Sequence, residues 1–87
     1  MVKGKVTIVN KTGLHARPAS VFVKETLKYK SSININVNGK DYNAKSILGV
    51  LAACAKCGTE MEIICDGEDE KEALAGMIAV VQSGLGE

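Results

Sequence analysis

The chain has 87 residues, the size of one small domain, and we expect a single domain over residues 1–87. Eleven Lys and Arg against ten Asp and Glu leave a net charge of +1, which excludes the basic excess of a nucleic-acid-binding surface. Aromatic residues make up only 3% and Trp is missing, so the chain also lacks the stacking platforms that bind single-stranded nucleic acid.

The N-terminal quarter of the chain predicts a strand followed by a helix. Val6 and Ile8 alternate with polar neighbours, which predicts a half-buried strand over residues 2–9. A helix is expected over residues 16–27, because apolar residues recur there at helical spacing. The face that we expect to be buried consists of Ala19, Phe22, Val23 and Leu27.

The middle of the chain predicts a hairpin and then a short helix. Residues 33–37 alternate strictly between apolar and polar, and Asn38-Gly39 is a strong turn signal before a short returning strand over residues 40–43. Ser46 then caps a short helix that extends to about Ala53, because a Ser hydroxyl accepts a hydrogen bond from a free amide at a helix start.

The C-terminal third predicts a fourth strand and a last helix. Residues 60–65 alternate, and Asp69 with Glu72 forms a capping box at the start of the helix. One stripe of this helix is apolar at helical spacing, formed by Leu74, Met77, Ile78 and Val81. The element order βαββαβα predicts an α+β fold, a two-layer open-faced sandwich with a four-stranded antiparallel sheet covered on one face by three helices.

His15 is the only histidine, and its neighbours favour chemistry at this position. Gly13 permits a tight turn and Pro18 suits a first helical turn, so His15 lies beside the start of the helix. The amides of Ala16 and Arg17 then have no helical partner and form an anion site with the helix dipole. The Arg17 guanidinium suits phosphate oxygens. Because a neutral imidazole is a nucleophile, the pattern indicates a histidine that accepts a phosphoryl group. The alternative is that His15 is a poor helix cap and Arg17 a solvated charge.

Residues 13–19, with residues 10–12 before them, resemble the active-site segment of the HPr family, the histidine-containing phosphocarriers of the bacterial phosphotransferase system. Residues 45–50 resemble the regulatory-serine segment of HPr from Gram-positive bacteria, and the likeness covers essentially the whole chain. It implies the strand order 1-4-2-3. It also implies that His15 takes a phosphoryl group from phospho-enzyme I and donates it to sugar-specific IIA domains, as a carrier with a covalent phosphohistidine and not as a free-standing enzyme.

The resemblance further implies regulation at Ser46 and a docking surface beside His15. Ser46 would be phosphorylated by HPr kinase/phosphorylase, with a catabolite-control transcription factor as a further partner. Enzyme I and the IIA domains would dock on an exposed apolar patch formed by Ile47, Leu48 and Leu51, and Ala16 and Ser20 would extend this surface. The alternative is that the apolar residues of this short helix all point into the core. The chain departs from the family at Leu48 and Leu51, where Met is frequent, and at Cys54, where Gly is frequent.

Three cysteines allow a metal or redox reading, but we expect neither. Cys54 and Cys57 form a C-x-x-C pattern, which could be a redox pair or half a zinc site. A zinc site needs four ligands, and only Cys65 and the distant His15 remain. We therefore expect reduced, partly buried thiols and no metal or cofactor.

Location and alternative functions complete the expectations. The apolar stretch over residues 47–55 is far shorter than the about 20 residues of a membrane helix, and residues 1–5 lack the apolar run of a signal peptide. We expect a cytoplasmic monomer without membrane insertion or direct binding of nucleic acid. The alternatives are an HPr-like catabolite corepressor, a class that lacks the active histidine, and a regulatory carrier of the nitrogen-related branch.

Overall fold

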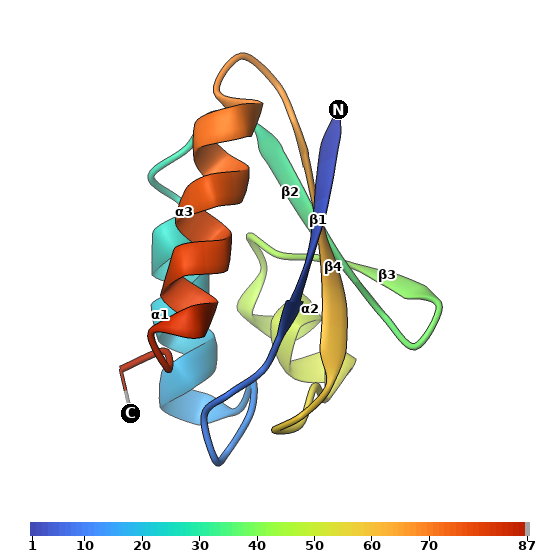
Figure 1. The fold of residues 1–87 in the computed structure, drawn as a ribbon, viewed down its shortest axis with the longest axis vertical. Coiled ribbons are helices and arrows are strands. Elements are labelled where there is room, and N and C mark those ends of the chain that lie inside the picture. Colours follow the sequence, from blue (N-terminus) through green and yellow to red (C-terminus); the bar gives the residue numbers. More distant parts are fainter. Residues whose placement is uncertain (87) are drawn as a thin grey trace.

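The computed structural model describes residues 1–86, and within them the chain forms four strands and three helices in the predicted order. The strands are β1 (Val2–Thr7), β2 (Ser32–Val37), β3 (Lys40–Asn43) and β4 (Glu60–Asp66), and the helices are α1 (Ala16–Thr26), α2 (Ile47–Ala53) and α3 (Glu70–Gln82). All paired strands are antiparallel, in the order β1-β4-β2-β3. The helices cover one face of this sheet (Figure 1), so the predicted two-layer fold and strand order are confirmed.

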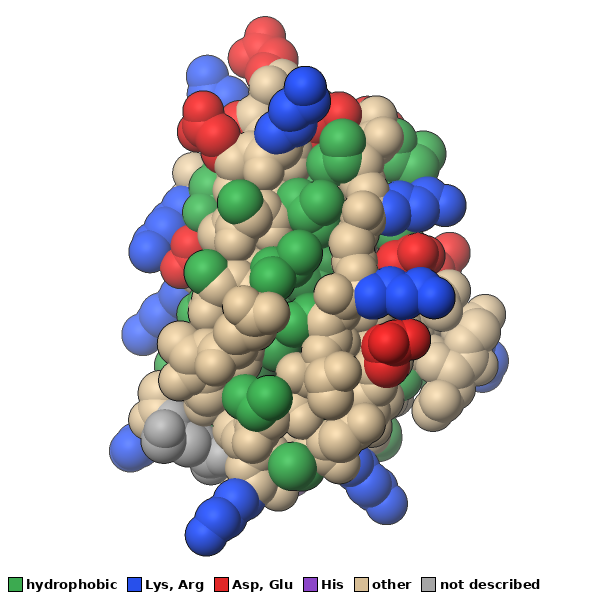
Figure 2. Space-filling view, in the orientation of Figure 1, with side chains coloured by type: hydrophobic (Ala, Val, Ile, Leu, Met, Phe, Trp, Pro, Cys, Tyr) green, Lys and Arg blue, Asp and Glu red, His purple; other side chains and the backbone are tan. Residues whose placement is uncertain are grey.

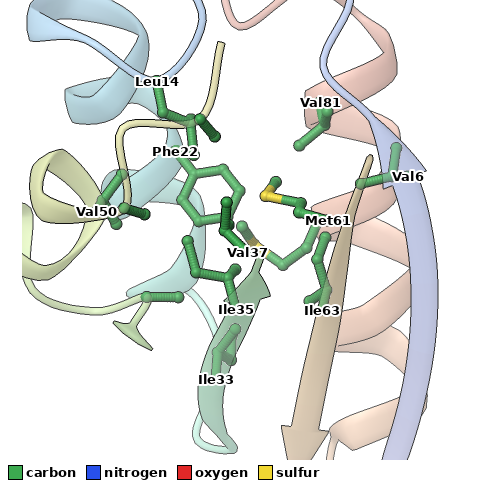
Figure 3. Packing of buried hydrophobic residues seen from close by; sticks show 14 of the residues in the cluster. Val6, Leu14, Phe22, Ile33, Ile35, Val37, Val50, Met61, Ile63 and Val81 are labelled. Atoms are coloured by element: carbon green, nitrogen blue, oxygen red, sulfur yellow. The ribbon is translucent and has the colours of Figure 1, made fainter. Parts of the chain in front are cut away.

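The helix layer closes on the sheet through apolar side chains that alternate along the strands. α3 crosses β1 at Gly4, where an added Cβ would lie 3.0 Å from Cδ1 of Ile78. Hydrophobic side chains fill the seam between this helix and the strand (Figure 2). Deeper in the core, the ring of Phe22 lies among Leu14, Val50 and Val37 (Figure 3), and all four side chains are buried. The core therefore joins α1 and α2 directly to the loop that precedes His15.

Two of the predicted elements, the first strand and the first helix, end earlier than expected. β1 ends at Thr7, although Ile8 still exchanges backbone hydrogen bonds of 2.9 and 2.8 Å with Thr59 and Gly58 in the loop before β4. α1 ends at Thr26, and Leu27, predicted to be buried, is 65% exposed. The reason is that the buried stripe of α1 ends at Thr26, whose hydroxyl donates to the Val23 carbonyl.

The predicted capping box at the start of α3 is wrong. Asp69 occupies the N-cap position, but its side chain makes no capping hydrogen bond. It instead accepts hydrogen bonds from the amides of Lys30 and Ser31, both at 2.9 Å, and from the Ser31 hydroxyl. Glu72 is exposed, and the carboxylate of Glu70 accepts from the Gly67 amide at 3.2 Å. Asp69 thus connects α3 to the loop after α1, a contact that local sequence patterns do not encode.

Candidate functional site

His15 is presented by a loop that is anchored on the segment after α2. Gly13 is buried with φ +67°, and a Cβ there would lie 2.3 Å from the Ala55 carbonyl oxygen. The Leu14 amide donates to that oxygen at 2.8 Å, while the Leu14 side chain is buried in the core. His15, the next residue, is exposed. The loop therefore holds His15 at the surface between a buried anchor and the start of α1.

The His15 side chain does not cap α1. Its backbone is extended, with φ −130° and ψ 157°, and its carbonyl accepts the first helical bond from Ala19 at 3.1 Å. The imidazole makes no capping hydrogen bond. The prediction that His15 lies at or beside the start of this helix is confirmed, since His15 is its N-cap residue, and the ring is left to interact with groups outside the helix.

The predicted anion cradle lies on the first turn of α1. Arg17 is exposed, and Pro18, which has no amide hydrogen, is buried. The amides of Ala16 and Arg17 belong to the turn whose donors find no partner within a helix, so they can receive phosphate oxygens. Ala16 has φ +26°, which is uncommon for a residue with a Cβ. This backbone strain was not expected from the sequence.

His15 lines a hollow of about 230 Å³ together with residues at the C-terminal end of α2 and in the segment after it. This hollow is lined by Thr12, Leu14, His15, Leu51, Cys54, Ala55 and Lys56. Sequence reasoning placed Leu51 near His15 but missed Cys54, Ala55 and Lys56. Arg17 lies outside this lining. Lys56 adds a cation to the surroundings of His15 that only the packing of the two loops reveals.

The docking patch expected beside His15 is exposed only in part. Leu48 is 76% exposed and Ile47 39%, whereas Leu51 is half-buried. The alternative that every apolar residue of α2 points into the core is therefore wrong: Val50 and Ala53 are buried, but Ile47 and Leu48 are exposed. Ala16 and Ser20 are exposed on α1, which packs against α2.

Ser46 caps α2 as predicted. Its hydroxyl accepts a hydrogen bond from the Gly49 amide at 3.2 Å. It lies at the opposite end of α2 from Cys54, about 12 Å away along the helix at about 1.5 Å per residue. Ser46 is thus separate from the His15 hollow but shares a helix with it.

The three cysteines are free thiols, but their burial differs from the expectation. Cys54 and Cys57 are exposed, whereas Cys65 is buried, and that burial raises the pKa of the Cys65 thiol. Cys54 ends α2 in a left-handed conformation with φ +50°. Among residues 1–86, no three His, Cys, Asp or Glu side chains come together to hold a metal ion. No helix in this range is long and apolar enough to cross a membrane.

Known proteins resemble this chain over nearly its whole length. The family described as "PTS HPr component phosphorylation site" matches residues 2–83. The chain is 46% identical to the HPr-like protein Crh of Bacillus subtilis, over 94% of this chain and 96% of that protein. It is 49% identical to the phosphocarrier protein HPr of Mycoplasma capricolum, over 85% of this chain and 83% of that protein. A crystal structure of HPr from Thermoanaerobacter tengcongensis superposes with a TM-score of 0.96 at 38% identity, covering 100% of this chain and 98% of that one.

Proposed function

This chain belongs to the HPr family, and from that premise we propose that His15 carries a phosphoryl group between enzyme I and sugar-specific IIA domains. The observation that carries the proposal is the position of His15 at the start of α1: the residue is exposed and its imidazole makes no capping hydrogen bond to the helix. An imidazole that must collect a phosphoryl group from one protein and give it to another has to be accessible to both. No cofactor or metal of this chain enters the proposed transfer.

The transfer forms a nitrogen–phosphorus bond on His15. A ring nitrogen of neutral His15 attacks the phosphorus carried by phospho-enzyme I, and the bond between phosphorus and enzyme I breaks as the new bond forms. The amides of Ala16 and Arg17 and the Arg17 guanidinium stabilise the phosphoryl oxygens through charge-assisted hydrogen bonds. The same steps in the opposite sense pass the group to a IIA domain.

Docking of both partners is assigned to the apolar patch of α2 with Ala16 and Ser20 on its rim. The apolar side chains of Leu48 and Ile47 are exposed to solvent and lie outside the core of the domain. Leu51 continues the patch into the hollow that contains His15. A partner that covers this patch excludes water from the reacting group, which strengthens the electrostatic contacts there.

The test is phosphorylation by enzyme I and phosphoenolpyruvate, measured as acid-labile phosphate on the chain. His15→Ala should abolish incorporation while its melting temperature stays near that of the wild type, because His15 is exposed. Arg17→Ala should slow transfer about ten- to a hundred-fold, since one charge-assisted contact is lost. Incorporation that persists in His15→Ala would refute the site.

Regulation at Ser46 is the second part of the proposal. A kinase/phosphorylase would modify the Ser46 hydroxyl, and the phosphorylated chain would bind a catabolite-control transcription factor. The added charge lies beside the apolar Ile47 and Leu48, where docking must strip it of water. Ser46→Asp should therefore raise the enzyme I KM while the melting temperature holds, because a carboxylate also caps a helix. Equal KM values for Ser46→Asp and wild type would remove both the patch and the regulation.

We further propose that residues 1–87 act as a single cytoplasmic domain and a monomer. A relative from Thermoanaerobacter tengcongensis was crystallised as an HPr dimer, and Crh of Bacillus subtilis as a swapped dimer. Sedimentation at micromolar concentration decides between the monomer and the dimer for this chain.

The resemblance to Crh also supports a corepressor function as the second candidate. The presence of His15 favours the carrier.

A further inference from the structure

We propose that Asn10 is a positioning residue for His15: its buried carboxamide fixes the carbonyl group that also binds the His15 amide. The inference rests on the proposed role of His15 and adds a residue that contacts neither the phosphoryl group nor a partner. Asn10 lies five positions before His15, in the loop between β1 and α1, and is only 4% exposed.

The hydrogen bonds of Asn10 close the loop from one side. Its Nδ2 donates to the Gly13 carbonyl oxygen at 2.8 Å, and its own carbonyl accepts from the Gly13 amide at 3.2 Å. The His15 amide donates to the same Gly13 oxygen at 3.0 Å. Asn10 and His15 therefore meet at one acceptor, and the position of that acceptor sets the position of the His15 backbone.

The peptide group between Gly13 and Leu14 is held from the other side as well. Its amide, which belongs to Leu14, donates to the Ala55 carbonyl at 2.8 Å. Asn10 thus holds the oxygen end of this peptide group and Ala55 the amide end. Without the Asn10 donor, the hydrogen bonds that remain on this peptide group are those to the Ala55 carbonyl and from the His15 amide.

Asn10 occupies a buried position at a cost in folding free energy. Its Oδ1 atom is buried and finds no hydrogen-bond partner within residues 1–86. A buried acceptor without a partner destabilises the folded state, and a side chain of similar shape without polar atoms would avoid this penalty. The part of Asn10 that gains from its position is therefore the Nδ2 donor, which acts on Gly13.

This arrangement predicts a change in the chemical step and not in docking. Asn10 is buried and lies outside the apolar patch of α2, so its replacement leaves the surface that binds enzyme I unchanged. A small displacement of a nucleophile can lower a rate by an order of magnitude or more. We expect Asn10→Leu to lower kcat for phosphorylation by enzyme I about tenfold and to leave KM within about two-fold.

The experiment compares Asn10→Leu and Asn10→Ala with Ser31→Ala. Both Asn10 variants remove the donor, and Asn10→Ala keeps the test valid if Leu is not accommodated. Ser31→Ala removes a hydrogen bond to Asp69, the N-cap residue of α3. The start of α3 and the start of α1 lie at opposite ends of the molecule (Figure 1). For each variant we would measure melting temperature, kcat and KM, and the ring resonances of His15 by NMR.

The expected result is a shift of the His15 ring resonances and a fall in kcat for both Asn10 variants, with Ser31→Ala resembling wild type in both. A kcat within about two-fold of wild type, or an equal fall in Ser31→Ala, would overturn the inference. Because the NMR measurement needs no phosphoryl donor, unchanged ring resonances in Asn10→Leu would overturn it independently. Failure of the wild-type chain to accept phosphate would instead count against the proposed function.

Discussion

Backbone strain lies directly beside the proposed phosphoryl acceptor. Ala16 has φ +26°, a conformation that costs a residue with a Cβ on the order of 1–3 kcal/mol. Ala16 is itself exposed, so contacts of its own side chain in the core do not compensate this cost. The buried side chains of Leu14 and Pro18, on either side, do so by fixing where the chain leaves the loop and enters α1. At this position the neighbours, and not the residue itself, determine the backbone.

Asp69 shows how a single carboxylate can secure a loop far along the chain. Hydrogen bonds from the Ser31 hydroxyl and from the amides of Lys30 and Ser31 lower the pKa of Asp69 from 3.8 to about 2. A carboxyl group whose pKa is lower in the folded state stabilises that state above its unfolded pKa. This contribution is lost as the pH falls from about 4 towards about 2.

We therefore expect Asp69→Asn to be less stable than wild type near pH 6, with a gap that narrows as the pH falls from 4 to 2. Melting temperatures across this range measure the gap. Ser31→Ala removes only one of the three donors, so it should show a smaller gap in the same direction. A gap for Asp69→Asn that does not change with pH would show that the ionised carboxylate is not what stabilises the loop.

At the scale of elements, α2 ends in a backbone conformation that suits Gly better than the Cys54 found there. Cys54 takes a left-handed conformation with φ +50° and ψ +37°, in which Gly is preferred at helix ends. Gly is also frequent at this position in the family that the sequence resembles. The departure noted in the sequence is thus a departure in side chain only, because the backbone keeps the conformation that suits Gly.

Cys54→Gly should raise the free energy of unfolding by about 0.5–1 kcal/mol, since it removes the steric cost of a Cβ in this conformation. Chemical denaturation measures this change. Cys54→Ala is the matched control, because it removes the thiol but keeps the Cβ, and it should stay near wild type. If Ala stabilises the chain as much as Gly does, the thiol and not the backbone is the source of the cost.

The elements that could be predicted are those that local periodicity determines. Alternation along β2 and β4 and the cap at Ser46 were correct, because each depends on residues close in the sequence. The partner of Asp69 and the approach of Lys56 to His15 depend on loops that packing brings together, and no local pattern encodes them. The predicted burial of Leu27 was wrong for a related reason, since the apolar character of a residue does not by itself show where the buried face of a helix ends.

Across residues 1–86 of the molecule, the two stretches of sequence that line the hollow at His15 contain no acidic residue. No Asp or Glu precedes Glu25 in the chain, and none occurs over residues 42–59. The loop before α1 and the segment around α2, which together form the hollow, come from these two acid-free stretches. Acidic residues gather instead in residues 66–72, near the start of α3. The lower end of Figure 2 shows Lys and Arg side chains.

This distribution of charge matters more than the net charge of +1, because the proposed donor, phospho-enzyme I, carries a negatively charged phosphoryl group. Long-range attraction accelerates association and weakens with salt, whose screening length is about 8 Å at physiological ionic strength. We expect the association rate with phospho-enzyme I to fall as salt rises. Lys56→Glu should lower it a few-fold at low salt, because Lys56 lines the hollow with His15.

Lys71→Glu is the matched control, because it changes the net charge equally but lies at the acidic start of α3. Stopped-flow association at low and physiological salt separates the two variants. If steering depends on where charge is placed, only Lys56→Glu slows association, and the difference shrinks as salt rises. Equal effects would mean that the partner responds to total charge alone. The absence of acidic residues from the two stretches of sequence around His15 would then need a different physical reason.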